Sequence, residues 1–158
     1  MVNNCTCISH LDYCSSICGS TSAVHLRLLQ CVLNAAARLI VKRRKFDCIT
    51  DPPRDELHWL PVQYRHTYKI CLLVYKCSPE TAPSCLIDQC ISVAVNPARS
   101  SLRSASKHEL LYPRTNLLRY GQRSFSVIGQ NTWNQLPPNI RDPSLSFGNF
   151  CRRRKTVV

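Results

Sequence analysis

The chain has 158 residues, 44% of them hydrophobic and 19% charged, so it is long enough to bury a core and ordinary in polarity for a globular protein. Its 21 Lys and Arg residues outnumber its 9 Asp and Glu residues, which gives a formal net charge of +12. This excess favours a polyanionic partner, above all RNA or DNA. We expect no membrane partner, because no predicted helix pairs a clean basic face with a shallow apolar one.

Cysteine is frequent, with 11 residues. The first ten residues, MVNNCTCISH, have neither a basic start nor an apolar run, so they are not typical of a signal peptide. No stretch reaches about 18 consecutive apolar residues, and we therefore expect no transmembrane helix. We expect a reducing compartment, nuclear or cytoplasmic, and not secretion. Cys31 and Cys71 lie within apolar helical patterns, where a free thiol is a small buried side chain.

Residues 1–22 contain no Lys or Arg and are predicted to form a flexible N-terminal segment. A helix is predicted from Val24 to about Val41, because apolar residues recur there at helical spacing. The candidates for its N-cap are Ser20, Thr21 and Ser22. The residues of its expected apolar face are Leu28, Leu29, Val32, Ala35, Ala36, Leu39 and Ile40. The residues expected on its opposite face are Gln30, Asn34 and Arg38.

The clearest periodicity of the chain lies in residues 54–77. A short helix is predicted over 52–58. Pro61 then breaks the chain, and a longer helix is predicted over 64–77. Trp59 is expected to anchor this longer helix by packing back against it, because a tryptophan buries a large apolar area.

Two groups of cations accompany these helices. Lys42-Arg43-Arg44-Lys45 follows the first helix, where cations suit the helix dipole but would serve equally as a phosphate grip or an import signal. Arg65, Lys69 and Lys76 gather on one side of the longer helix. They are either the solvated side of a core helix or a row of cations that faces phosphate, and the pattern alone leaves both interpretations open.

The composition changes over residues 92–123, where six cations stand among serines with one acid, Glu109. This composition is typical of a basic, partly ordered linker. Short strands are predicted at Leu110–Tyr112 and Ser124–Val127, so the linker is expected to contain a β-hairpin.

Three further short helices are predicted. One lies within 81–91, and a second contains Trp133 and ends before Pro137. The last is capped by Ser144 and ends in a run of four cations at 152–155.

The predicted fold is mainly α, a small helical bundle with a short β-hairpin in the C-terminal third. The expected divisions are the flexible segment over 1–22, a helical core region over 23–91, and a basic linker, β-hairpin and C-terminal helices over 92–158. No internal repeat and no low-complexity tract is apparent.

The residues for metal or catalytic chemistry do not fall into a diagnostic pattern. Cys5, Cys7, Cys14 and Cys18, with His10 among them, supply enough ligands for zinc. Their C-x-C and C-x3-C spacings lack the paired C-x2-C knuckles of zinc modules, so we expect neither a metal nor a cofactor. The sequence contains no adjacent Asp-Asp pair, no G-x-S-x-G motif and no phosphate-binding loop. The chain is therefore predicted not to be an enzyme.

Seven blocks occur in a characteristic order: LDYCSS, LLQCVLNAAARLI, RDELHWLPV, YKICLLVYKC, LRSAS, YGQRSFSV and WNQLPPNIRDPSLS. In this order they resemble the C-terminal region of the reverse-transcriptase polyprotein of non-LTR retrotransposons of the jockey and chicken-repeat type. The resemblance covers about residues 11–156. In that family the polymerase palm, with its paired metal-binding aspartates, lies upstream, so the resemblance implies a fragment without the reaction centre.

The resemblance also implies a protein that handles RNA and target DNA, with the missing reverse-transcriptase domain as a second expected partner. The predicted function is non-catalytic, sequence-nonspecific binding of RNA or DNA through basic clusters. The alternative is an inert or partner-dependent structural remnant without independent activity. The predicted nucleic-acid-binding residues are Lys42, Arg43, Arg44, Lys45, Arg65, Lys69, Arg114, Arg119, Arg123, Arg152, Arg153, Arg154 and Lys155.

Overall fold

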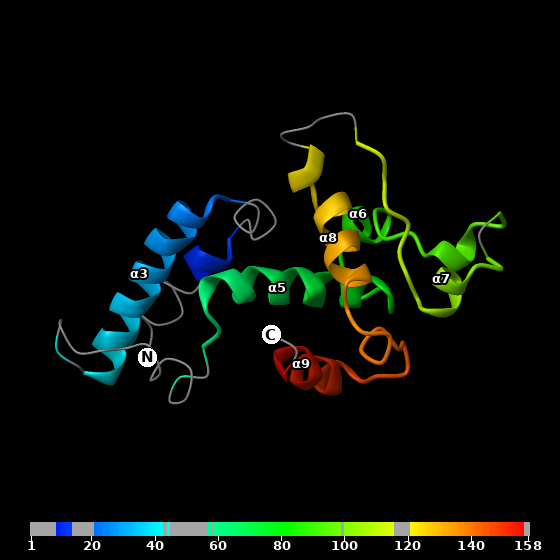
Figure 1. Cartoon of the computed structure of the whole chain (residues 1–158). Helices are drawn as coiled ribbons and strands as arrows, with labels where there is room; N and C mark the ends of the chain where they lie inside the picture. Colours follow the sequence, from blue (N-terminus) through cyan, green and yellow to red (C-terminus); the bar gives the residue numbers. More distant parts are fainter. Residues whose placement is uncertain are drawn as a thin grey trace. The chain divides into compact units, whose positions relative to one another are not determined.

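The computed structural model of the chain describes residues 9–13, 21–42, 44, 57, 59–98, 100–115 and 121–156. The chain divides into two compact units, Met1–Thr67 and Tyr68–Val158. Helices dominate the described residues of both (Figure 1), which confirms the prediction of a mainly α fold. The predicted β-hairpin is wrong, since the described residues contain no strand and only one isolated antiparallel bridge, between Ser92 and Leu110. The divisions predicted after residues 22 and 91 stay predictions.

The first long helix is α3, Ala23–Val41, which occupies the segment predicted to be helical. Ser22 precedes it in an extended conformation, and the Ser22 hydroxyl lies 2.7 Å from Nδ1 of His25. Lys42 closes the helix in the left-handed region, with φ 56°, and its N–H donates to the carbonyl of Arg38. This is a common way to end a helix, although glycine usually occupies the position.

The buried face of α3 differs from the face that the sequence predicts. Leu33 and Ala37 are buried, whereas Leu28, Val32 and Leu39 are 61%, 54% and 82% exposed. The predicted face was wrong because apolar residues surround most of this helix, so its periodicity does not select one side. In the part of the chain that is described, α3 is also the one helix long and apolar enough to cross a membrane. Core helices and signal sequences meet the same criterion.

A small cluster in the first unit explains which side of α3 is covered. Leu11, Leu33 and Val62 are buried together, and Trp59 packs against them, as expected for an anchor. The Gln30 side chain accepts a hydrogen bond from the Val62 N–H at 2.9 Å. This N–H belongs to the first turn of a helix and has no partner within that helix, so Gln30 caps it.

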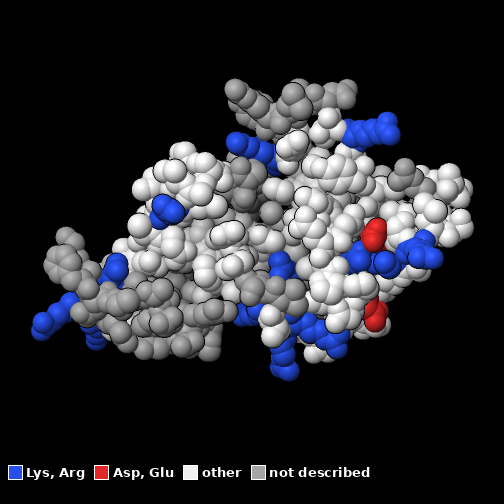
Figure 2. Space-filling model, in the orientation of Figure 1, with Lys and Arg blue, Asp and Glu red and all other residues white. Residues whose placement is uncertain are grey.

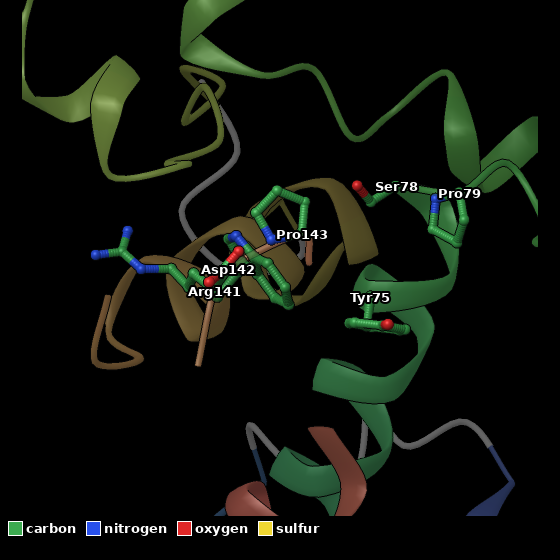
Figure 3. Close-up of a pocket in the computed structure, with 7 residues that line it drawn as sticks. Tyr75, Ser78, Pro79, Arg141, Asp142 and Pro143 are labelled. Atoms are coloured by element: carbon green, nitrogen blue, oxygen red, sulfur yellow. The ribbon is translucent and has the colours of Figure 1, made fainter. Parts of the chain in front are cut away.

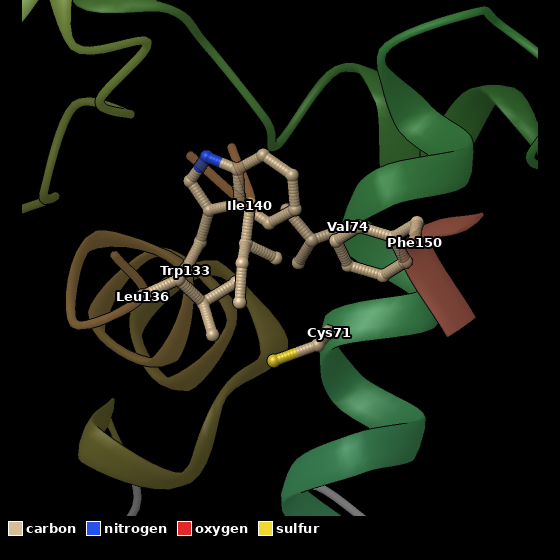
Figure 4. Close-up of a cluster of buried hydrophobic side chains, with 6 residues drawn as sticks. All are labelled: Cys71, Val74, Trp133, Leu136, Ile140 and Phe150. Atoms are coloured by element: carbon tan, nitrogen blue, oxygen red, sulfur yellow. The ribbon is translucent and has the colours of Figure 1, made fainter. Parts of the chain in front are cut away.

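The longer helix is α5, Val62–Cys77, which begins directly after Pro61. Its last two turns contribute to the core of the second unit. There Cys71 and Val74 of α5 face Trp133 and Ile140, and Phe150 lies beside Val74 (Figure 4). The sixth buried member of this cluster is Leu136.

Aromatic contacts fix the side of α5 that is covered. The rings of Tyr75 and Phe150 are stacked with their centroids 4.4 Å apart, and the centroids of Trp133 and Phe150 lie 5.9 Å apart. The Tyr75 hydroxyl donates to the carbonyl of Leu145 at 2.5 Å. Such pairs contribute beyond their buried area, so this face of α5 is firmly held.

The segment predicted as the second strand of the hairpin belongs instead to α8, Phe125–Asn134. Ser124 is extended and serves as its N-cap residue. Val127, Gln130 and Trp133 are buried at spacings of three, which is the period of a helix and not of a strand. A window as short as 124–127 does not show this period, so the strand prediction was wrong.

Residues of α8 bond one edge of the other predicted strand, whose opposite edge pairs with residues 91–93 through the bridge at Ser92 and Leu110. The Asn134 side chain accepts from the Leu110 N–H and donates to the Leu110 carbonyl, both at 2.9 Å. The indole N–H of Trp133 donates to the carbonyl of His108 at 3.0 Å. The Asn134 side chain thus satisfies the backbone groups of Leu110 that face away from the bridge to Ser92, and no second strand is needed on that edge.

The remaining elements are short, apart from the last helix. They are α6 (Ser84–Ile87), η1 (Val93–Val95), α7 (Arg103–Ser106) and η2 (Gly121–Arg123). The last helix is α9, Phe147–Thr156. The predicted short helix over 52–58 lies outside the described residues apart from Leu57.

Candidate nucleic-acid interface

The outward side of α9 carries the densest group of exposed cations among the described residues. Arg152, Arg153 and Lys155 are all exposed. Figure 2, in the orientation of Figure 1, shows Lys and Arg side chains grouped over this part of the molecule. Nη1 of Arg153 donates to the carbonyl of Asn139 at 3.2 Å, which leaves the rest of its guanidinium at the surface. The arrangement provides a short positive surface that suits phosphate.

Arg154 interrupts this run, because its side chain turns inward. It is 6% exposed, and its Nε donates to Sγ of Cys71 at 3.4 Å. Burial raises the pKa of the Cys71 thiol, an effect that the neighbouring guanidinium opposes. Arg154 lies four residues after the buried Phe150 and so on the same helix face. A phosphate contact by Arg154, as the sequence predicted, is not compatible with this position.

The three cations predicted to form a row on α5 differ in their exposure and in their partners. Arg65 makes a two-pronged ion pair with Asp12, with an Nη2–Oδ2 distance of 2.9 Å, and its side chain is 13% exposed. Lys69 is half-buried. Lys76 is exposed, and its Nζ lies 5.3 Å from the centroid of the Phe147 ring. The charge of Arg65 is therefore balanced within the protein, whereas Lys76 extends the cationic surface next to the first turn of α9.

The other predicted contacts are dispersed. Lys42, Arg44, Arg114 and Arg123 are exposed at positions remote from α9 in the sequence. Arg43, Lys45 and Arg119 lie outside the described residues.

A pocket of about 250 Å³ lies beside Tyr75 in the second unit. Figure 3 shows Tyr75, Ser78 and Pro79 on one side of it and the segment of Asp142 and Pro143 on the other. Trp133 contributes a further wall. The lining is mostly apolar, and its polar and charged residues are Ser78, Arg141 and Asp142. Sequence patterns gave no sign of this pocket, because its two sides are separated by more than fifty residues.

The Asp142 carboxylate is fixed by its local turn. Its Oδ1 accepts from the Ser144 N–H at 2.8 Å. Hydrogen bonds from the backbone and side chain of Ser144 lower the pKa of Asp142, with smaller contributions from His108 and Arg153. The Asp142 carboxylate at the rim of the pocket is therefore ionised at neutral pH.

Arg141 is a buried cation that the sequence did not single out. It is 4% exposed, and its Nη1 lies 3.4 Å from Oε1 of Glu109. Neither Nε nor Nη1 has a hydrogen-bond acceptor. In Figure 3 the guanidinium points away from Tyr75. Its place in the WNQLPPNIRDPSLS block of the resemblance was the one available signal, and its contact with Glu109 gives that block a structural role.

The structure gives no support for a metal centre in the part of the chain that it describes. No group of three or more His, Cys, Asp and Glu side chains is close enough there to hold an ion. Cys5, Cys7, Cys14 and Cys18, the alternative zinc ligands, lie outside the described residues. Burial, followed by the proximity of Cys77, raises the pKa of Cys90 to about 12, so this thiol stays protonated at neutral pH.

Comparisons of the chain with protein-family models, with curated proteins and with solved structures give no match.

Proposed function

We propose that the chain is a non-catalytic fragment of a non-LTR retrotransposon reverse-transcriptase protein that binds RNA or DNA without sequence specificity. The observation that carries the binding is the exposed group Arg152, Arg153 and Lys155 on α9, in a chain of net charge +12. The retrotransposon origin rests on the ordered sequence blocks alone.

Contact with phosphates would supply most of the affinity in this proposal. The released counterions then make the binding constant fall steeply as salt is added. Neither Arg65 nor Arg154 takes part, because one is paired with Asp12 and the other is buried against Cys71. Catalysis is not part of the proposal, since the resemblance assigns the polymerase aspartates to an upstream region.

The test is a titration of the whole chain with labelled single-stranded and double-stranded oligonucleotides at several salt concentrations. We expect binding at low ionic strength, with similar affinity for unrelated sequences and a steep loss at higher salt. Absence of binding at low ionic strength would remove the proposal.

A second candidate is a structural remnant that depends on a partner, and the exposed face of α3 favours it. Val24, Leu28, Val32 and Leu39 are each more than half exposed. They recur at intervals of four, four and seven residues along one side of the helix. Isolated exposed apolar residues are ordinary, but a continuous row usually marks a contact surface. This candidate predicts a chain that binds no nucleic acid and self-associates or precipitates when purified alone.

A further inference from the structure

We infer that the pocket beside Tyr75 accepts an unpaired nucleobase, so that the preferred partner is single-stranded nucleic acid. The inference rests on the proposed function, because it concerns a nucleic acid that the cations of α9 already attract. It adds which form of nucleic acid binds and where one of its bases lies.

The size and walls of the pocket suit a flat aromatic ring. A cavity of roughly 150 Å³ is enough for benzene, and this pocket has a volume of about 250 Å³. Tyr75 supplies most of the aromatic surface, Trp133 adds a small part because it is only 6% exposed, and Pro79 and Pro143 supply aliphatic surface. Stacking on such groups tolerates any base, because every base has a π-face.

The charges around the pocket separate a base from a phosphate. The lining holds one cation, Arg141, and one anion, Asp142. The Arg141 guanidinium points away from Tyr75 and lies 3.4 Å from the Glu109 carboxylate (Figure 3). The ionised Asp142 carboxylate at the rim repels a phosphate group but accepts hydrogen bonds from the N–H groups of a base. The nearest exposed cation in the sequence is Lys76, which follows the pocket residue Tyr75. The pocket would therefore take the base, and Lys76 the phosphate next to it.

Phe147 extends the aromatic surface beyond the pocket. Its ring centroid lies 5.8 Å from that of Tyr75, and the residue is 44% exposed. The Lys76 ammonium, 5.3 Å from the centroid of this ring, is held by a cation–π contact. A second base can replace the ammonium on the ring while the ammonium moves to a phosphate. Alternating aromatic and cationic groups of this kind are typical of sites for single strands.

Base pairing in a duplex opposes this mode of binding. A paired base is stacked within the helix and has to be unpaired and turned outward before it can enter a pocket. Single strands avoid this cost, so they should bind more tightly than a duplex of the same length.

The experiment is a fluorescence-anisotropy titration of the whole chain at low salt. Its probes are a labelled oligothymidylate of about 12 nucleotides, the same strand in a blunt duplex, and a strand with abasic sites in place of the bases. We expect the single strand to bind roughly 5- to 150-fold more tightly than the abasic strand, the range for one stacked base. The duplex should bind like the abasic strand.

Variants locate the effect. Ser78→Phe fills the pocket from an exposed position, and Phe147→Ala removes the neighbouring ring. Both should weaken binding of the single strand, and Ser78→Phe, which removes no charge and no contact of Lys76, should leave binding of the duplex unchanged. The matched controls are Ser101→Phe, which adds the same ring at another exposed position, and Tyr112→Ala, which removes another exposed aromatic ring. Neither control should alter binding.

The outcomes distinguish this inference from the proposed function. If the single, abasic and duplex forms bind the wild-type chain equally well, the base pocket is refuted while nonspecific phosphate binding stands. If none of them binds at low salt, both fall. The comparison of the single and abasic strands uses only wild-type protein, so the inference remains testable even if Ser78→Phe fails to fold.

Discussion

The Asn134 side chain makes two backbone hydrogen bonds of the kind that a neighbouring strand makes in a sheet. Its amide bonds both the N–H and the carbonyl of Leu110. We predict that Asn134→Ala lowers the free energy of unfolding by at least about 2 kcal/mol, because each half-buried backbone group left unsatisfied costs about 1–3 kcal/mol. Asn131→Ala is the control, since Asn131 is exposed on the same helix. Urea denaturation measures both, and equal losses would contradict the role of Asn134.

The burial of His66 makes the stability of the fold depend on pH. It is fully buried, and neither ring nitrogen has a hydrogen-bond partner. Burial lowers the pKa of His66 below 6.5, with nearby Arg65 acting in the same direction and Asp12 against it. The unfolded chain therefore binds a proton before the folded chain does, so stability is complete above pH 6.5 and falls as the pH drops below it.

We predict that His66→Leu removes this contribution. The difference in the free energy of unfolding between the variant and the wild type should grow in favour of the variant as the pH is lowered from 7.5 to about 5. Urea denaturation at each pH provides the comparison, which cancels the carboxylates common to both chains. His25→Leu, at an exposed position, serves as the control. A difference that stays constant with pH would show that His66 does not titrate as described.

At the scale of the element, the two sides of α3 test which face is covered. Leu33 is 2% exposed and its neighbour Val32 is 54% exposed. We predict that Leu33→Ala lowers the free energy of unfolding by about 2–5 kcal/mol and that Val32→Ala changes it by less than about 0.5 kcal/mol. Thermal or chemical denaturation distinguishes them. A larger loss for Val32→Ala than for Leu33→Ala would mean that the apolar face predicted from the sequence is the buried one.

The helix α9 likewise has one buried and one exposed phenylalanine, whose removal should have different effects. Phe150 is fully buried against Tyr75 and Trp133, whereas Phe147 is 44% exposed. We predict a loss of about 3–5 kcal/mol in the free energy of unfolding for Phe150→Ala and a much smaller loss for Phe147→Ala. Near-ultraviolet circular dichroism and urea denaturation measure both. Similar losses for the two variants would mean that Phe147 belongs to the core.

The sequence was sufficient for those helices whose caps and breakers are local. Pro61 immediately precedes the first residue of α5, and the predicted helix that contains Trp133 is present as α8. It was insufficient where long-range contacts decide. The segment around Leu110 takes its place from distant residues: it pairs with residues 91–93, and side chains more than twenty residues later bond the backbone of His108 and Leu110. The covered side of α3 depends on Val62 and Leu11, which its own periodicity does not reveal.

The same limit applies to the candidate interface. A count of cations finds the run at 152–155 but not the inward turn of Arg154, which follows from its spacing to Phe150. Nor does it find that Asp12 pairs with Arg65 from 53 residues away. Charge composition therefore predicts the class of partner, and packing decides which cations remain available to it.

At the scale of the whole molecule, the net charge of +12 has to act through particular exposed cations if the proposed function is correct. Each phosphate contact with a single strand contributes about 0.7 to the slope of the logarithm of the binding constant against the logarithm of the salt concentration. Three contacts from α9 should therefore contribute about 2. A variant that loses the same charge elsewhere should keep that part of the slope.

The most direct test compares two triple variants with the wild-type chain in salt titrations against a labelled single strand. In the first, Arg152, Arg153 and Lys155 become Gln; in the second, the exposed Arg27, Arg103 and Lys107 become Gln. We predict that the first has weaker affinity and a slope less steep by about 2, and that the second stays close to wild type. Equal slopes for both variants, or no binding by the wild-type chain at low ionic strength, would contradict the assignment of nucleic-acid binding to α9.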